Sequence, residues 1–411
     1  MRVLLINYSG DQFNPGCRAS SSGLITMLRA AGTSHIDTMP LGFTPEAMSF
    51  PLSADEDGLQ LPSRQNPRAK KTVRDFFHFM LKIKRLSTRF AAHFRSMRLP
   101  PWAQVVHPSN SFVVNLEADR WTKAIDEIME READGFHDLR LADRVIVNGE
   151  GTFHHNQRTA LAALALARIA EILGKEVHII NATIQAMHPD VLRLVLGSAG
   201  RVVVREVRSK QYLESLGIHC LVGADCAFAA PYRVTQPMLR LPDEVAPDSP
   251  CLVSGGCGLR SSSVLAIVNA LRRAGFSPFY FWIGDGDAIS IGDCQAAGIP
   301  VVMWNEVPWP VLPEYLKQVK LVVSGRHHMI IFALLAHIPF VPLASNTWKI
   351  EGLCELFGWP VPVLPGEHGF ARALSSLPEL QTEMKAAFER VDKTALELAL
   401  RNMAEIPIEE S

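Results

Sequence analysis

Short apolar runs alternate with segments of helical apolar spacing along most of this chain. Runs such as Val3–Ile6, Val145–Val147 and Leu321–Ser324 are short and strongly apolar, as is typical of strands buried on both faces. Each run leads into a polar loop and then into a segment of helical pattern, such as Arg158–Leu173. This alternation predicts strand–helix–strand units, and therefore parallel sheets of the α/β class.

The same rhythm occurs in two halves of the chain, separated by the proline-rich stretch Arg233–Ser249. We therefore expect two Rossmann-type domains with a cleft between them, an arrangement that is GT-B-like. The expected boundaries are an N-terminal domain at 1–235, a linker at 236–249, a C-terminal domain at 250–375, and a terminal helix at 376–411 that returns to the N-terminal domain.

A long stretch after Pro40 interrupts the α/β rhythm and predicts an insertion at about 45–115. Within it, residues 68–98 carry ten basic residues against one acidic residue, with apolar residues at helical spacing. This pattern predicts a basic amphipathic helix or helix pair. Such a helix could contact an anionic membrane surface, or it could pack on its own domain and leave its basic face in solvent.

Composition narrows the class of protein. Among 411 residues, 48% are hydrophobic and 20% charged, which is typical of a soluble globular chain. The 41 basic and 42 acidic residues nearly cancel, so overall charge gives no argument for nucleic acid. None of the seven cysteines forms a CxxC pair, so neither a zinc site nor a disulfide framework is indicated. With neither a signal peptide nor a membrane span in the pattern, we expect a cytoplasmic protein.

Polar loops follow four of the predicted strands in the N-terminal half. They lie at residues 7–17, 148–156 and 205–209 and near Asp225. Because the carboxyl ends of parallel strands meet at one edge of a sheet, these loops predict a ligand site there. Asp11 and Asn14 could contact a substrate or could brace their own loop. The first loop lacks the GxGxxG fingerprint, which argues against a dinucleotide.

A second candidate site follows the predicted strand that ends at Ser324. Gly325 and Arg326 come next, and a helix is expected from about Met329. Backbone N–H groups at a helix start favour an anion, and an arginine adds a forked donor. The alternative is that Arg326 pairs with a neighbouring carboxylate and the adjacent histidines are surface residues.

Taken together, these loops make the chain resemble the polysaccharide pyruvyl transferase family. The chain departs from the family pattern at three positions. Glu206 stands where the family more often has Asp, Glu150 where it more often has Gly, and His327 where it more often has an apolar residue. The segments that carry the resemblance are Asn7-x-x-Gly10-Asp11-x-x-Asn14-x-Gly16, Gly149-x-Gly151-x-Phe153, Arg205-x-x-x-Ser209 with Asp225 after it, Arg326-x-His328, and Lys349.

The resemblance implies transfer of pyruvate from phosphoenolpyruvate to two hydroxyls of a sugar, giving a cyclic ketal in exopolysaccharide or cell-envelope biosynthesis. It implies no metal and no cofactor beyond this donor substrate. His328 is the expected general acid, which Arg326 and Arg205 assist. The expected donor-binding residues are Arg205, Arg326, Lys349, Ser324 and Gly325. The expected acceptor-binding residues are Asp11, Asn14, Glu150, His154 and His155.

Two other functions fit the same pattern. A GT-B-type glycosyltransferase would place the diphosphate of a nucleotide sugar on Arg326 and Lys349. A non-catalytic polysaccharide-binding or assembly protein would keep the fold without the chemistry. The acceptor could be a free or a lipid-linked oligosaccharide, and residues 68–98 could bring the protein to the inner face of the membrane.

Overall fold

The computed structural model describes residues 1–39 except Phe13, six residues between 119 and 129, and residues 137–233, 239–256, 259–284 and 287–403. The expected basic insertion at about 45–115 lies outside these residues. The chain forms two compact units. Unit 1 contains Met1–Asp11, Gly32–Val203 and Tyr212–Cys220, and unit 2 contains Gln12–Ala31, Val204–Gln211 and Leu221–Ser411.

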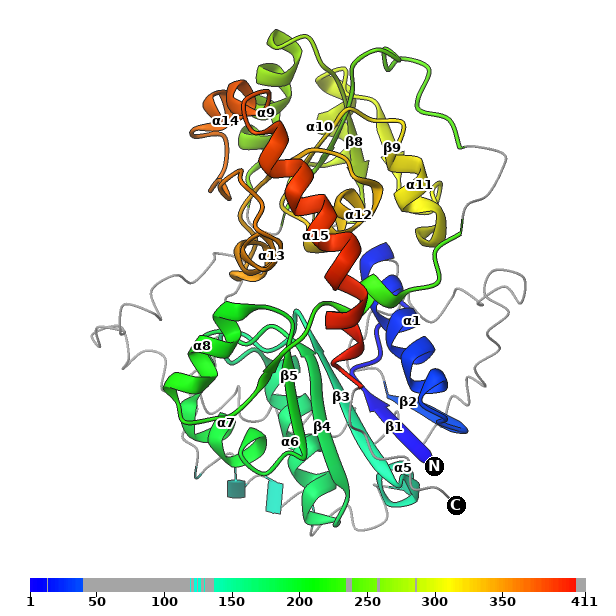
Figure 1. Ribbon diagram of the computed structural model, residues 1–411, viewed down its shortest axis with the longest axis vertical. Coiled ribbons are helices and arrows are strands. Elements are labelled where there is room, and N and C mark those ends of the chain that lie inside the picture. The colour runs from blue at the N-terminus through cyan, green and yellow to red at the C-terminus, as the bar shows by residue number, and fades with distance from the viewer. Residues whose placement is uncertain are drawn as a thin grey trace. The chain divides into compact units, whose positions relative to one another are not determined.

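The first sheet has six strands in the order β2-β1-β3-β4-β5-β6 (Figure 1). β1 pairs in parallel with β2 and β3, and β3 pairs in parallel with β4. The strands are β1 (Arg2–Ile6), β2 (His35–Met39), β3 (Arg144–Glu150), β4 (Glu176–Ala182), β5 (Arg201–Val204) and β6 (Leu221–Val222). The helices of this part of the chain are α1 (Pro15–Ala30), α5 (His137–Leu141), α6 (Arg158–Ile172), α7 (Pro189–Leu196) and α8 (Val207–Ser215).

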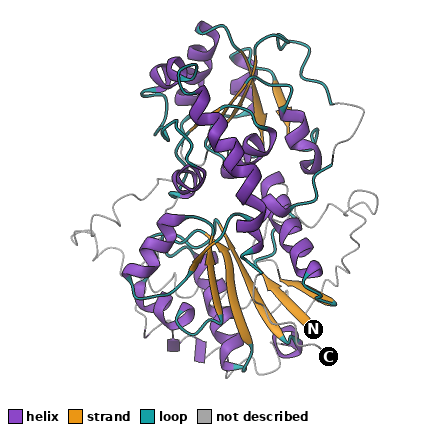
Figure 2. Cartoon of the chain, viewed as in Figure 1, coloured by secondary structure: helices purple, strands orange, loops and turns teal. Residues whose placement is uncertain are grey.

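The second sheet has five strands in the order β11-β10-β7-β8-β9, and all four pairings are parallel. Helices lie beside the strands of each sheet (Figure 2). The strands are β7 (Pro250–Ser254), β8 (Ser277–Trp282), β9 (Val301–Met303), β10 (Leu321–Ser324) and β11 (Phe340–Pro342). The helices are η4 (Cys226–Ala229), α9 (Ser261–Arg273), α10 (Ile291–Ala296), η5 (Trp309–Val311), α11 (Leu312–Leu316), α12 (His327–Ala336), α13 (Lys349–Phe357), α14 (Phe370–Ser376) and α15 (Gln381–Leu400).

Two parallel sheets confirm the predicted α/β class. The strongly apolar run of α12 is nearly all buried, and it packs with β7, β8 and β10 into the core of unit 2. Burial of each large apolar side chain such as Phe332 stabilises the fold by about 1.5–3 kcal/mol. A helix of this kind can keep polar residues at its first turn fixed, because the rest of it cannot move without opening the core. Among the described residues, no helix is long and apolar enough to cross a membrane.

The predicted start of one helix was wrong. α12 begins at His327, not Met329, so both histidines belong to its first turn. α1 begins at Pro15, because Asn14 is its N-cap and proline is favourable at the first helical position.

Candidate functional site

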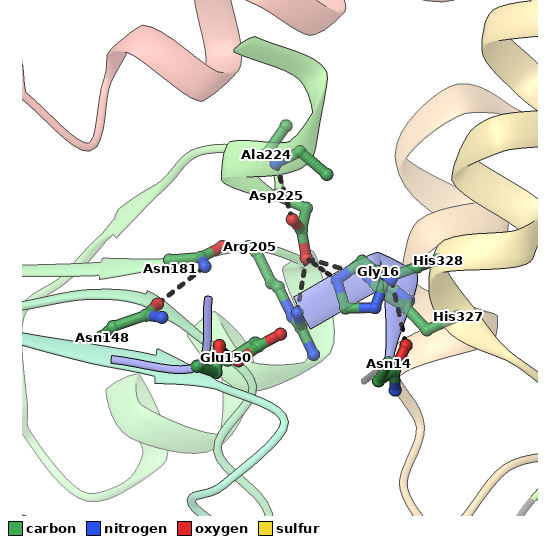
Figure 3. Close-up of polar contacts among 12 residues, drawn as sticks. Asn14, Gly16, Asn148, Glu150, Asn181, Arg205, Ala224, Asp225, His327 and His328 are labelled. Atoms are coloured by element: carbon green, nitrogen blue, oxygen red, sulfur yellow. Dashed lines mark hydrogen bonds and ion pairs between the residues drawn. The ribbon is translucent and has the colours of Figure 1, made fainter. Parts of the chain in front are cut away.

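Arg205 and Asp225 form a buried ion pair in the candidate site (Figure 3). The apolar strand β5 ends at Val204, which places Arg205 at its carboxyl end. Asp225 is the N-cap of η4, and its Oδ1 accepts a hydrogen bond of 2.8 Å from the N–H of Ala227. Its Oδ2 lies 2.5 Å from an Arg205 Nη, and both side chains are only 1% exposed.

Two histidines from the first turn of α12 face the same carboxylate oxygen. The Nε2 atoms of His327 and His328 lie 3.3 Å and 3.4 Å from Asp225 Oδ2. The side chain of His327 is 4% exposed and that of His328 is 13% exposed, so His328 is the more accessible ring. The structure thus brings predicted residues Arg205 and His328 to one carboxylate.

The first turn of α1 packs against the ring of His328. The Oδ1 of Asn14 accepts a hydrogen bond of 3.0 Å from Gly16 N, so Asn14 caps the helix (Figure 3). A Cβ at Gly16 would lie 2.2 Å from His328 Cβ and Cγ and 2.3 Å from Nδ1. Position 16 therefore admits only glycine if the ring is to keep its place. Of the two possibilities for Asn14, the structure shows the bracing role, and its contact with an acceptor remains a prediction.

The charges in this cluster are strongly coupled. Burial by itself raises the pKa of Asp225, but the charges of His328 and Arg205 and hydrogen bonds from both histidines hold it well below the ordinary value. Burial and the charge of Arg205 lower the pKa of His327 to about 3, although Asp225 partly opposes this. At neutral pH the cluster therefore contains a carboxylate, a guanidinium and a neutral His327. A carboxylate that orients an imidazole is an arrangement suited to proton transfer.

Arg326 lies beside this cluster as the N-cap of α12. Its guanidinium pairs with Asp287, and its Nε donates a 2.8 Å hydrogen bond to Gly255 O. Of the two roles considered for Arg326, the structure therefore shows the ion pair with a neighbouring carboxylate. The side chain is still 15% exposed, so part of it can meet a ligand.

Ser324 and Gly325 have structural roles at the same strand end. Ser324 is fully buried, and its Oγ accepts a 2.9 Å hydrogen bond from Arg326 N. A Cβ at Gly325 would lie 2.8 Å from the Cα of Gly256, so glycine is required for the backbones to pass. These contacts explain why serine and glycine stand at these positions, whether or not a ligand binds there. Contact of Ser324 and Gly325 with the donor stays a prediction.

Lys349 and Trp348 follow β11 and begin α13. Lys349 Nζ donates a 2.6 Å hydrogen bond to Asn346 Oδ1. Trp348 Nε1 donates to Glu206 Oε1 at 3.2 Å, and Glu206 also accepts from the N–H of Ser209 at 2.9 Å. Burial raises the pKa of Glu206, although these hydrogen bonds partly oppose it. Glu206, one of the departures from the family pattern, is therefore a buried carboxylate that caps α8 and holds the indole.

In unit 1, the carboxyl ends of β1, β3 and β4 are joined by buried polar side chains. Asn7 Nδ2 donates to Asn148 O at 2.6 Å. Asn181 Nδ2 donates to Asn148 Oδ1 at 2.9 Å (Figure 3). Ser9 Oγ donates to Glu150 Oε2 at 2.8 Å, and Glu150 is only 6% exposed. Asn7, Glu150 and Asn181 all have positive φ, a conformation that costs energy and clusters at functional sites.

The remaining predicted acceptor residues are Asp11, His154 and His155. The Nδ1 atoms of the two histidines lie 3.0 Å apart, and both residues are at most 5% exposed. The structure therefore shows them bound to each other, and their contact with a sugar remains a prediction. Asp11 is more accessible, and burial raises its pKa despite a backbone hydrogen bond. A carboxylate with a raised pKa is a stronger base.

Comparison with known families gives one match, in the central part of the chain. Residues 54–254 match the model of the polysaccharide pyruvyl transferase family. The match confirms the resemblance inferred from the sequence. It includes Glu150, Arg205 and Asp225, whereas the loop at 7–17 and the segment from Arg326 to Lys349 lie outside the matched residues. No curated protein matches the chain.

Two solved structures illustrate the fold that this chain shares with known proteins. A co-structure of S. aureus MnaA with UDP has 11% sequence identity and a TM-score of 0.52, covering 97% of this chain and 94% of that one. A putative UDP-N-acetylglucosamine 2-epimerase from Listeria monocytogenes has 9% identity and a TM-score of 0.50, with the same coverage. At such low identity these likenesses show the fold alone, and the fold is GT-B-like as predicted.

The sequence analysis placed Asp225 near a strand end but gave it no partner in the site. Asp225 carries a readable local signal, because an aspartate before a short helical turn is a typical N-cap. Its contacts with Arg205, His327 and His328 join positions far apart in the chain, and no local pattern reports them.

Proposed function

We propose that this protein transfers pyruvate from phosphoenolpyruvate to two hydroxyls of a sugar in a polysaccharide or its lipid-linked precursor. The observation that carries the proposal is the buried Asp225 with Arg205 and His328 on one oxygen, in a chain whose central residues match the pyruvyl transferase family. An oriented imidazole beside cationic residues suits a substrate that is an anion and must be protonated on carbon.

The reaction needs one proton donor and one proton acceptor. His328 gives a proton to the methylene carbon of phosphoenolpyruvate, which leaves the central carbon electrophilic. One sugar hydroxyl forms a C–O bond there and loses its proton to a carboxylate. The C–O bond to phosphate then breaks, and the second hydroxyl closes the ketal while its proton passes to the departing phosphate. The products are the ketal and inorganic phosphate.

Arg326 and Lys349 are the cations of unit 2 that we assign to the donor. Arg326 is partly exposed at the start of α12, and Lys349 begins α13. Helix starts favour anions, so phosphate and carboxylate groups are stabilised there along with the two side chains. Arg205 has almost no exposed surface, so in this proposal it acts from behind Asp225. Asp11 is the proposed base for the acceptor, because burial raises its pKa.

The test is turnover of phosphoenolpyruvate with candidate sugar acceptors, free and lipid-linked, with the product identified by its mass. His328→Ala should lower turnover by about 100-fold or more, because a general acid typically contributes that much. Arg326→Ala should raise KM for phosphoenolpyruvate. The matched controls are His219→Ala and Arg372→Ala, since both residues are exposed.

Near wild-type turnover in His328→Ala would overturn the assignment of the acid. The glycosyltransferase alternative is tested by ligand-induced stabilisation, because a ligand that binds the folded state raises the melting temperature. Stabilisation by a nucleotide sugar, with none by phosphoenolpyruvate, would replace the proposed function.

A further inference from the structure

We propose that Asp225 is the positioning residue of this site: it fixes the orientation and tautomer of His328, while His327 acts as a neutral donor that holds Asp225. The inference rests on the proposed function only for the reaction that His328 serves. The contacts themselves are properties of unit 2. It also gives a role to His327, which stands where the family more often has an apolar residue.

The carboxylate of Asp225 is held by contacts on both of its oxygens. Oδ1 accepts from Ala227 N at 2.8 Å, and Oδ2 meets Arg205 at 2.5 Å and the two histidines at 3.3 Å and 3.4 Å. Rotation of the carboxylate would break several contacts in a site from which water is largely excluded. Its position is therefore fixed before any substrate arrives.

The two histidines cannot have the same role. A carboxylate only accepts hydrogen bonds, so the Nε2 of His327 that faces it must carry the proton. Burial and Arg205 lower the pKa of His327 to about 3, so this ring stays neutral at working pH. His327 is thus a fixed N–H donor, and the more exposed His328 is left as the ring that can change its charge.

The position of Asp225 also favours one tautomer of His328. Its Nε2 lies 3.4 Å from Asp225 Oδ2, and a nitrogen that faces a carboxylate is favoured to carry the proton, which leaves Nδ1 as the unprotonated nitrogen of the neutral ring. The other groups around this carboxylate and ring are Arg205, the neutral His327, Tyr232 and the start of α1 at Gly16.

NMR of histidine labelled with ¹⁵N tests this directly. In the wild type, the ¹⁵N shifts of neutral His328 should show the proton on Nε2. In Asp225→Asn an amide replaces the carboxylate that faces Nε2, so the ¹⁵N shifts of His328 should move away from the Nε2-protonated pattern. His327→Gln should preserve the wild-type pattern of His328 because an amide N–H can still donate to Asp225, whereas His327→Phe should disturb it.

The chain offers a matched control in a second pair. His337 Nε2 lies 2.8 Å from Asp392 Oδ1, and both side chains are about half exposed. Asp392→Asn should alter the ¹⁵N shifts of His337 and leave those of His328 unchanged. A wild-type His328 with its proton on Nδ1 would overturn the proposal, and this measurement needs no variant to fold. Unchanged ¹⁵N shifts of His328 in folded Asp225→Asn would overturn it as well.

Kinetics separate this inference from the proposed function. If Asp225 positions the acid, Asp225→Asn should lower kcat for pyruvyl transfer and change KM for phosphoenolpyruvate little. Absence of pyruvyl transfer in the wild type, with the NMR result intact, refutes the function and leaves the positioning role. Pyruvyl transfer in the wild type, with unaltered ¹⁵N shifts of His328 in Asp225→Asn, refutes the positioning role and leaves the function.

Discussion

Gly16 offers a sharp test of how the candidate acid is held. In Gly16→Ala the new methyl group would lie 2.2 Å from two carbons of His328, whereas ordinary contacts begin at 3.4 Å. With the backbone held, the imidazole must retreat by about 1.2 Å, or α1 must shift away from α12. Overpacking of this kind typically costs about 1–3 kcal/mol of folding free energy.

The consequence for turnover should exceed the consequence for stability. A displacement of about 1 Å in a reacting group can lower a rate by about 100-fold. We therefore expect Gly16→Ala to fold, to lose about 1–3 kcal/mol in urea unfolding, and to lose about 100-fold in kcat. The NMR signals of His328 should shift, because its distance from Asp225 changes.

The control is Gly292→Ala in α10, where the nearest atom lies 3.8 Å from the added Cβ. Alanine is the better helix former, so this variant should be as stable as the wild type or slightly more stable. If Gly16→Ala matches Gly292→Ala in stability, turnover and His328 signals, the packing of α1 on the imidazole is refuted.

Three further predictions concern other described contacts. Trp348→Phe removes the N–H that donates to Glu206, so the free energy of unfolding measured in urea should fall by about 1–3 kcal/mol. The control Trp282→Phe should lower it by less. Equal losses in the two variants would contradict a stabilising role for the indole N–H of Trp348. Burial is the main cause that lowers the pKa of His178 to about 4, below its ordinary value, so its contribution to stability is present above about pH 6.5 and is lost as pH falls from there towards 4. The free energy of unfolding of His178→Asn should therefore fall less steeply with falling pH over this range than that of the wild type. Parallel curves of unfolding free energy against pH for the two proteins would contradict this prediction. Arg208→Ala breaks an exposed ion pair with Glu355 and should change stability by only about 1 kcal/mol or less; a larger loss would show that this pair is not solvent-screened.

The strand–loop–helix order was readable because buried parallel strands are short apolar runs, and Val3–Ile6 and Leu321–Ser324 have no other plausible state. That order also placed Arg205 and Arg326 at strand ends. The start of α1 also has a local signal, since Asn14-Pro15 is an N-cap followed by a favourable first residue.

The partners of the charged residues were not readable. Asp225 meets His327 over a separation of 102 residues, and Arg326 meets Asp287 over 39. Each carboxylate lies in a loop whose sequence is equally compatible with a solvent-exposed turn. The packing of α12 and η4 determines which residues Asp225 meets, and that packing depends on many apolar contacts at once.

The segments on which Asp225 depends come from both ends of this sequence. Gly23 of α1 packs against the carbonyl of Cys226 in η4, and Ala224 N donates to Leu398 O in α15 at 3.0 Å. During synthesis, α1 leaves the ribosome well before α15 and must wait for it before η4 is enclosed. The proton-transfer cluster is therefore expected to mature only after α15 has emerged. Fragments cut at 233–249 should yield no working half of it, and recombination at that boundary would not transfer the cluster as a module.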